Sequence, residues 1–354
     1  MYEKILKIIT LPILLLTVAT CIGMKYMPDL HERALKTAEI EAWLESQEIE
    51  AEIPESEAVE AVSSIVEEDE LGGQLRIQIP DGIERTDISI KNDYVTQTIF
   101  ISFDSDIEDY FCNYSISGSS DHIASLYYYN KAKKGVIALG LDKVYEIETD
   151  IVNDNLYIDF INPHDIYDKI VVVDAGHGSR ASGAVKLDIK EKEIDLAIVL
   201  ELKKIFEKSS ENIGVYYTRT EDKNPTFKQR ADLANKSEAD LFISIHNNSS
   251  PSGAFSNLSG TQVLYRQSDK SGLSRKFAQI CLNNVVNKLE SRKIGLLEGD
   301  DIYIIRSSDV PVALIEVGFM TNKAELEKLT SQEYQQKAAE GIYNAILEAF
   351  EKGY

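Results

Sequence analysis

The feature that most constrains the fold is an alternation of short apolar runs with helical patterns, which extends from Lys169 to the C-terminus. The apolar runs have the length of strands and few polar interruptions, which is typical of parallel strands buried on both faces. These runs are 170–174, 215–218, 241–246, 261–265 and 312–317. The helical patterns are 193–208, 226–236, 271–289, 324–330 and 331–350. This order predicts an α/β fold, with a mainly parallel sheet and helices on both of its faces.

The region ahead of this alternation, residues 71–166, has a different pattern. Apolar residues occupy every second position at 75–79, 99–103 and 156–160, and clusters of Gly, Asn and Asp separate such runs. A period of two is typical of antiparallel strands with one face buried. We therefore expect a small β-rich domain at 71–166, followed by an α/β domain at 167–354.

The first 27 residues contain an apolar run, from Ile8 to Met24, of 17 residues. This is the short end of a membrane span, and Lys4 and Lys7 on its N-terminal side predict that the N-terminus stays inside. We expect an uncleaved signal anchor at 1–27. A cleaved signal peptide and a lipoprotein signal ending at Cys21 are the alternatives. All three place the remainder outside the cytoplasm, in the cell envelope.

Residues 28–70 are predicted to form an acidic linker. From Glu39 to Glu70 there are 13 acidic residues and no Lys or Arg. Such a segment repels itself and has little apolar surface to bury, so we expect a solvated, extended chain. A long acidic helix is the alternative, because Glu and Ala favour helix. The net charge of the whole chain, −22, argues against nucleic acid as a partner.

Two histidines stand at the ends of predicted strands. His177 lies between Gly176 and Gly178, directly after the first strand, and the glycines leave open space around its imidazole. His246 ends the third strand. Reactive groups of α/β sheets collect where strands end, so we expect the two imidazoles to converge. One histidine alone is more often structural, but a converging pair suits zinc.

A zinc hydrolase normally has three protein ligands and one open position for water. No further histidine is suitably placed, so we expect a carboxylate as the third ligand. Glu191 is three residues before Ile194 and extends the apolar stripe of the following helix, whereas Glu193 lies on its solvent side. The helical pattern therefore favours Glu191. Asp188, in the preceding loop, is a weaker candidate.

Glu316 interrupts the apolar strand at 312–317. A buried charge is costly unless it is paired or functional. We expect Glu316 to be the catalytic residue, which takes a proton from water and passes it to the leaving nitrogen, with its pKa raised by burial. A structural ion pair with Arg306 is the alternative.

Six motifs in order make residues 169–350 resemble the zinc-dependent N-acetylmuramoyl-L-alanine amidases of the type-3 amidase superfamily. They are Val-Asp-Ala-Gly-His-Gly at 173–178, Glu-Lys-Glu-Ile-Asp-Leu-Ala at 191–197, Thr-Arg-Thr-Glu-Asp at 218–222, Gln-Arg-Ala-Asp-Leu-Ala-Asn at 229–235, Ser-Ile-His-Asn-Asn at 244–248 and Ile-Glu-Val-Gly-Phe-Met-Thr-Asn at 315–322. The resemblance implies one zinc ion held by His177, Glu191 and His246, with Glu316 as the catalytic glutamate. It also implies cleavage of the amide between N-acetylmuramic acid and L-alanine in bacterial peptidoglycan.

The resemblance carries further expectations and leaves two alternatives. Arg219 and Arg230, which fall in the shared motifs, are interpreted as members of scaffold ion pairs. The β-rich domain faintly resembles domains that dock such amidases on the cell wall, which predicts a targeting role. The alternatives are a cell-wall-binding protein that has lost turnover, and a zinc peptidase that acts within the stem peptide.

Overall fold

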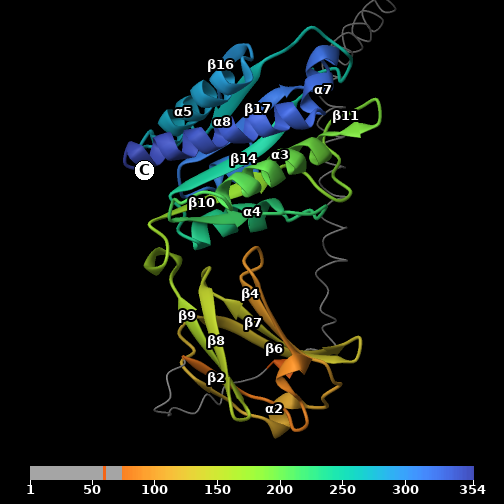
Figure 1. The fold of residues 1–354 in the computed structure, drawn as a ribbon, viewed down its shortest axis with the longest axis vertical. Helices are drawn as coiled ribbons and strands as arrows, with labels where there is room; N and C mark the ends of the chain where they lie inside the picture. The colour runs from red at the N-terminus through yellow and green to blue at the C-terminus, as the bar shows by residue number, and fades with distance from the viewer. Residues whose placement is uncertain (1–58, 61–73) are drawn as a thin grey trace, which may run out of the picture. The chain divides into compact units, whose positions relative to one another are not determined.

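The structure is a computed structural model that describes residues 59–60 and 74–354 (Figure 1). The predicted membrane anchor at 1–27 lies outside the described residues, as does the predicted linker at 28–70 except for Val59–Glu60. Among the residues that are described, no helix is both long enough and apolar enough to span a membrane.

The β-rich region consists of two antiparallel sheets. The first has the order β1-β6-β7-β4-β3, with bounds Val59–Glu60, Ile123–Lys131, Lys134–Leu141, Thr98–Phe103 and Ile88–Asp93. The second has the order β5-β2-β9-β8, with bounds Ile116–Gly118, Leu75–Gln78, Asn155–Ile161 and Glu146–Val152. A short helix, α2 (Tyr110–Asn113), accompanies them. Both sheets bury alternate apolar residues in one shared core, which makes the region a β-sandwich, as its period of two predicts.

The C-terminal region is built on one six-stranded sheet with the order β13-β10-β14-β17-β15-β16. Its strands are β10 (Lys169–Ala175), β13 (Ile213–Tyr217), β14 (Leu241–Asn248), β15 (Thr261–Tyr265), β16 (Lys293–Glu298) and β17 (Val312–Phe319). Every neighbouring pair is parallel except β15 and β17. The exception has a simple cause, because the connection at 249–260 contains no crossover helix, and without one the chain returns antiparallel.

Helices cover both faces of this sheet, as expected (Figure 1). On one face lie α3 (Glu191–Phe206), α5 (Leu273–Leu289) and α8 (Gln332–Glu351), whose apolar stripes share a core with alternate strand residues. On the other face lie α4 (Phe227–Lys236) and α6 (Tyr303–Arg306), over a second and smaller core. The helix α7 (Lys323–Leu329) follows β17. The α/β prediction is therefore confirmed.

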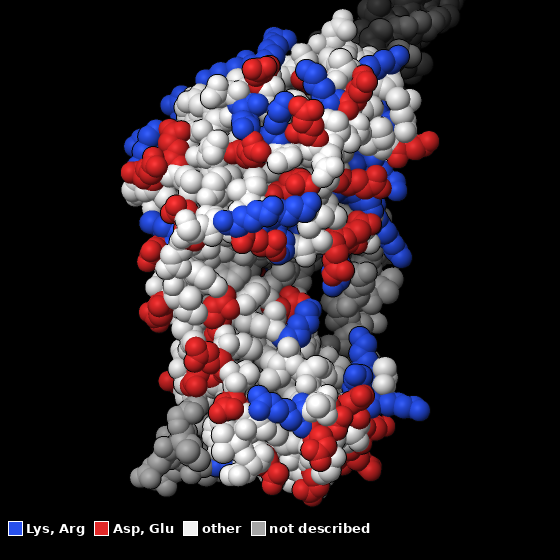
Figure 2. Space-filling view, in the orientation of Figure 1, with Lys and Arg blue, Asp and Glu red and all other residues white. Residues whose placement is uncertain are grey.

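Four elements of the α/β domain were not predicted from the sequence. Strand β16 lies at the edge of the sheet and is largely exposed, so it lacks the apolar pattern of a buried strand. The hairpin of β11 (Val185–Lys186) and β12 (Ile189–Lys190) and the helix α6 are too short to show a period. On the face drawn in Figure 2, basic and acidic side chains are interspersed over the helices, and no continuous basic surface is present there to suit nucleic acid.

Candidate metal centre and active site

The sheet places an imidazole and a carboxyl group side by side. His246 of β14 is in register with Glu316 of β17, which in turn is opposite Gln262 of β15. Residues paired across neighbouring strands project from the same face of a sheet. The register therefore brings together two residues that are 70 positions apart in the chain.

The second imidazole comes from the turn after β10. His177 has a φ of 58°, in the left-handed region, so the chain turns sharply there. A Cβ atom at Gly176 would lie 2.4 Å from Cε1 of His246, which explains why this position has no side chain. The two imidazole centroids are 4.8 Å apart. The predicted convergence of the histidines is what the structure shows.

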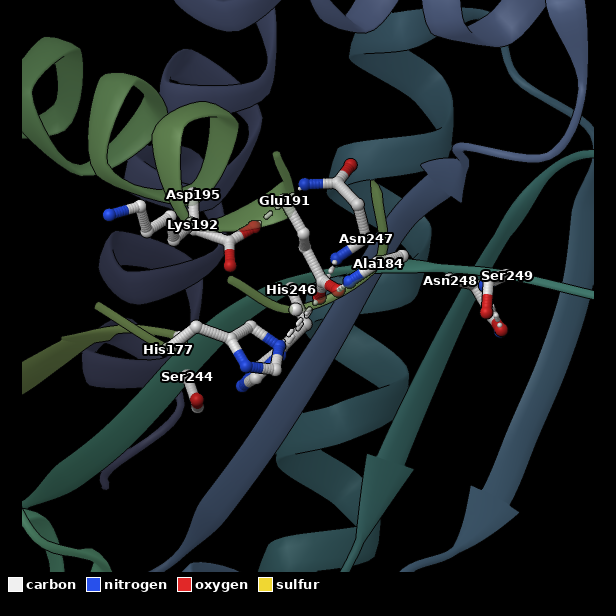
Figure 3. A network of polar contacts seen from close by, with 12 residues as sticks. His177, Ala184, Glu191, Lys192, Asp195, Ser244, His246, Asn247, Asn248 and Ser249 are labelled. Atoms are coloured by element: carbon white, nitrogen blue, oxygen red, sulfur yellow. Dashed lines mark hydrogen bonds and ion pairs between the residues drawn. The ribbon is translucent and has the colours of Figure 1, made fainter. Parts of the chain in front are cut away.

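Glu191, the first residue of α3, reaches toward both imidazoles (Figure 3). Its Oε1 lies 3.1 Å from Nε2 of His177 and 3.1 Å from Nδ1 of His246. The same oxygen accepts a hydrogen bond from the backbone N–H of Asn247, at 3.0 Å, and Oε2 accepts one from the N–H of Ala184, at 2.8 Å. Backbone N–H groups thus hold both carboxylate oxygens of Glu191 in place.

The other carboxylates considered from the sequence lie elsewhere. Glu193 is exposed, as the helical pattern predicted. Asp188 is exposed at the tip of the β11–β12 hairpin, with a φ of 65°, and is not among the clustered donors. Of the three candidates, the structure brings only Glu191 to the histidines.

The electrostatics of the cluster suit a cation. Burial disfavours the charged form of Glu191, but the neighbouring His177 and His246 outweigh it and hold the pKa of Glu191 well below its usual value. Burial is the main cause of a lowered pKa for His246, so its imidazole is neutral and has a lone pair to offer. A carboxylate beside a neutral imidazole is a donor set that zinc accepts.

The spacing of the donors also fits one ion. In tetrahedral zinc sites with bonds of about 2.0–2.1 Å, ligand atoms stand about 3.3 Å apart. The two separations of 3.1 Å between Glu191 and the imidazole nitrogens are close to this value. The side chain of His177 is 29% exposed, so the centre is open to solvent on that side, as a hydrolytic site requires.

Asp195 is a member of the cluster that the sequence analysis missed. Ligand atoms of Asp195, His177, Glu191 and His246 all lie within 4.8 Å of one another. Oδ1 of Asp195 accepts a hydrogen bond of 2.8 Å from the side chain of Asn247. Burial, and then the nearby Glu191, raise the pKa of Asp195 well above its usual value. The available signal was its position one turn after Glu191, on the same face of α3.

Glu316 lies in an environment that disfavours its charged form. Its Oε2 is screened from solvent and has no hydrogen-bond partner among the described residues. Burial, followed by the charge of Glu191, raises its pKa well above the usual range. The alternative partner, Arg306, instead donates to the carbonyl of Asp301 at 2.7 Å. The carboxyl group is therefore not part of an ion pair with Arg306.

A buried ion pair supports the turn that carries His177. Nη1 of Arg230 lies 2.5 Å from Oδ1 of Asp174, and Asp174 also accepts hydrogen bonds from Thr218 and Ser244. Arg230 further donates to the carbonyl of His177 at 2.7 Å. These contacts tie the end of β10 to its neighbours and agree with the scaffold role expected of Arg230.

The expectation for Arg219 needs correction. Its guanidinium donates to the carbonyls of Ala175, Gly176 and Lys192, and within the described region no ion pair of Arg219 is found. A guanidinium has five N–H donors and no acceptor, so one buried Arg can bond to several backbone carbonyls at once. It binds the His177 turn to the first turn of α3, which carries Glu191.

The chain is similar in sequence to N-acetylmuramoyl-L-alanine amidases. Residues 171–348 match the family described as N-acetylmuramoyl-L-alanine amidase. The uncharacterized protein YqiI of Bacillus subtilis (strain 168) is 41% identical over 180 residues, which are 50% of this chain and 83% of YqiI. The germination-specific N-acetylmuramoyl-L-alanine amidase of the same organism is 34% identical over 202 residues, 52% of this chain and 81% of that enzyme.

Among solved structures, an N-acetylmuramoyl-L-alanine amidase from Clostridium difficile 630 is 32% identical, with a TM-score of 0.49, and the match covers 52% of this chain and 98% of that one. The family match takes in both histidines, Glu191 and Glu316, and spans half of the chain. The chain therefore belongs to the N-acetylmuramoyl-L-alanine amidase family and is an amide hydrolase of peptidoglycan.

Proposed function

We propose that His177, Glu191 and His246 hold one zinc ion, and that with it the chain cleaves the amide between N-acetylmuramic acid and L-alanine. The observation that carries the proposal is the position of Glu191, whose Oε1 is 3.1 Å from a nitrogen of each imidazole. Zinc bound there would polarise the amide carbonyl and lower the pKa of a water molecule. The chain's own residues supply the proton transfers.

Glu316 is the base and then the acid in this proposal. Its carboxylate takes a proton from the attacking water, whose oxygen forms a bond to the carbonyl carbon of the lactyl group. The carbon–nitrogen bond breaks, and Glu316 passes the proton to the departing nitrogen of L-alanine. The support is its place beside His246 in the sheet and the lack of a partner for its Oε2 among the described residues.

The test compares two variants of the full chain. Glu316→Gln keeps the shape but cannot accept a proton, so hydrolysis is expected to fall by about 10²- to 10⁴-fold with zinc content unchanged. His177→Ala is expected to lose both zinc and hydrolysis. Metal content by mass spectrometry and release of amino groups from purified peptidoglycan are the measurements. Full activity in Glu316→Gln would remove this residue from the reaction.

The products distinguish the amidase from its two alternatives. Mass spectrometry of the digest is expected to show unsubstituted lactyl groups and peptides with free L-alanine N-termini. Peptides cleaved within the stem would identify a zinc peptidase instead. Zinc binding and retention of the chain on sacculi, without any cleavage, would identify a non-catalytic wall-binding protein.

We also propose that residues 1–27 anchor the chain in the membrane, that 28–70 are a linker, and that the β-rich domain at 71–166 directs the catalytic domain at 167–354 to the cell wall. The support is the apolar run, the acidic composition and the sandwich fold that precede the enzyme. Fractionation of cells that express the whole chain tests the anchor. Recovery of the protein in the soluble fraction of the cytoplasm would refute an extracytoplasmic location.

A further inference from the structure

An exposed phenylalanine ring lies within cation–π distance of two lysine ammonium groups. The ring of Phe255, a residue that is 40% exposed, has Nζ of Lys186 at 5.8 Å and Nζ of Lys323 at 5.2 Å from its centroid. We call these three residues the rim cluster. In the part of the chain that the structure describes, neither ammonium group forms an ion pair. Two cations that have no ion-pair partner among the described residues share one aromatic ring, although the chain carries a net charge of −22.

One member of the rim cluster is two residues along the chain from a residue that contacts Glu191. Lys186 is two residues after Ala184, whose N–H donates to Oε2 of Glu191 at 2.8 Å. Since a chain extends at most about 3.6 Å per residue, the Cα of Lys186 is within about 7 Å of the Cα of Ala184. A bound peptide in an extended conformation would span the same distance, about 7 Å, with two residues.

The other two members come from segments tied to the strand that carries His246. The N–H of Met320 donates to the carbonyl of Asn248 at 2.8 Å, which joins the start of the turn before α7 to the end of β14. The N–H of Ser256 donates to the carbonyl of Thr321 at 2.8 Å, which joins the loop of Phe255 to the same turn. These bonds hold the ring beside Lys323.

The hairpin that carries Lys186 also has a defined shape. Its two turn residues, Leu187 and Asp188, have φ values of 50° and 65°, as in the two-residue turns whose twist matches the paired strands. Residues other than glycine adopt this conformation at a cost, so the turn is held by the pairing of β11 with β12. The position of Lys186 relative to Glu191 is therefore set by the backbone.

We propose that the rim cluster binds a free carboxylate on the second residue of the stem peptide, counted from the bond that is cut. The two ammonium groups supply donors and positive charge, and the ring keeps both of them at one place by cation–π attraction. This proposal rests on the function proposed above, because it assumes that the peptide leaves the metal centre toward the β11–β12 hairpin. Its consequence is a preference for stems in which this carboxylate is not amidated.

The test uses two ligands that differ in one group. In both ligands, which are N-acetylmuramoyl-L-alanyl-D-glutamate derivatives, the γ-carboxyl group is amidated. In the acid the α-carboxylate is free, and in the amide a carboxamide takes its place. Hydrolysis is measured with the wild-type chain, and binding is measured by calorimetry with zinc-loaded Glu316→Gln. We expect the acid to be favoured by about fivefold to tenfold in both measurements, and less at high salt, because exposed charge pairs are weak and screened.

Substitutions assign the preference to the cluster. The double variant Lys186→Gln/Lys323→Gln is expected to bring the ratio between acid and amide close to one. Lys328→Gln removes an exposed charge farther along α7 and is expected to leave the ratio as in the wild type. Phe255→Leu is expected to lower the ratio, because the ammonium groups lose the ring that gathers them.

Each outcome decides one of the two proposals. Hydrolysis of both ligands at equal rates, or a ratio that survives in the double variant, overturns the carboxylate site and leaves the amidase intact. Preferential binding of the acid through the two lysines, without any cleavage by the wild type, supports the site and refutes the proposed function. Equal losses for both ligands in Phe255→Leu, with the ratio unchanged, would overturn the role of the ring in carboxylate binding.

Discussion

Replacement of Gly176 by alanine tests the geometry of the metal centre directly. The added methyl group would lie 2.4 Å from Cε1 and 2.6 Å from Nδ1 and Nε2 of His246. Ordinary contact begins at 3.4 Å, so the ring must move by about 1 Å. The backbone of Gly176 is not in the left-handed region, so strain of the main chain does not obscure the effect.

A shift of this size exceeds what a metal site tolerates. Ligand distances in such sites hold within about 0.2 Å, and a displacement of about 1 Å at a reacting centre can cost about 100-fold in rate. We therefore expect Gly176→Ala to lower kcat/KM by about 100-fold, or about 2.7 kcal/mol, and to weaken zinc binding. The assays are hydrolysis of purified peptidoglycan and zinc titration against a coloured chelator.

The control is Gly318→Ala in β17, where the new methyl group would meet its nearest neighbours at 3.4 and 3.5 Å. Zinc affinity and activity are expected to remain near those of the wild type. Circular dichroism verifies that both variants are folded. If folded Gly176→Ala bound zinc and hydrolysed peptidoglycan like the wild type, the inference that His246 must occupy its present position would be wrong.

Further predictions concern the supporting residues. Burial would raise the pKa of Asp174, but Arg230, Ser244 and Thr218 outweigh it and hold this pKa below its usual value of 3.8. The ionised Asp174 therefore stabilises the fold fully above pH 3.8, and this contribution is lost as the pH falls below that value. Acid unfolding of the wild type and of Asp174→Asn would measure the difference. Asp174→Asn leaves Arg230 buried and unpaired, and should cost about 3–5 kcal/mol in urea unfolding near pH 7. Burial and the nearby Glu191 raise the pKa of Asp195, which favours its neutral form, and Asn is a neutral side chain of similar shape. In the zinc-free protein, Asp195→Asn should therefore change the free energy of unfolding by less than about 1 kcal/mol. A larger decrease would contradict a neutral Asp195. Removal of zinc by a chelator should abolish hydrolysis reversibly and lower the unfolding free energy by about 4 kcal/mol relative to protein in zinc at 1,000 times Kd, as followed by thermal melts.

The sequence was informative wherever a pattern repeats along the chain. The apolar runs and helical stripes predicted five strands and five helices of the α/β domain in the correct order, because burial on a regular element imposes its period on the residues. The same reasoning separated Glu191 from Glu193, which differ by two positions on one helix and hence in the face they present.

The sequence was less informative where a residue's role depends on contacts between distant segments. Asp195 and Asn247 meet because the first turns of α3 lie beside the end of β14. The helical period places Asp195 on the face of Glu191, but no local pattern specifies Asn247 as its partner. Arg219 carries the charge of an ion-pair partner, yet its guanidinium donates to backbone carbonyls of β10 and α3. The reversal of β15 likewise followed from a connection without a helix, which the strand pattern itself does not encode.

Local spacing and the cost of burying charge were enough to predict the periodic strands and helices, the placement of the two histidines at strand ends, and the carboxylates that face inward. Only the tertiary arrangement shows which donor atoms lie close enough to bind one ion. The separation of 3.1 Å between Glu191 and each imidazole depends on strand register, on where α3 begins and on the absence of a side chain at Gly176. The tertiary structure also decided that Lys186 and Lys323, which are unremarkable in the sequence, meet at one ring. Lys186 and Lys323 are each nearly 70 positions from Phe255 in the chain, and no local pattern specifies contacts over such separations.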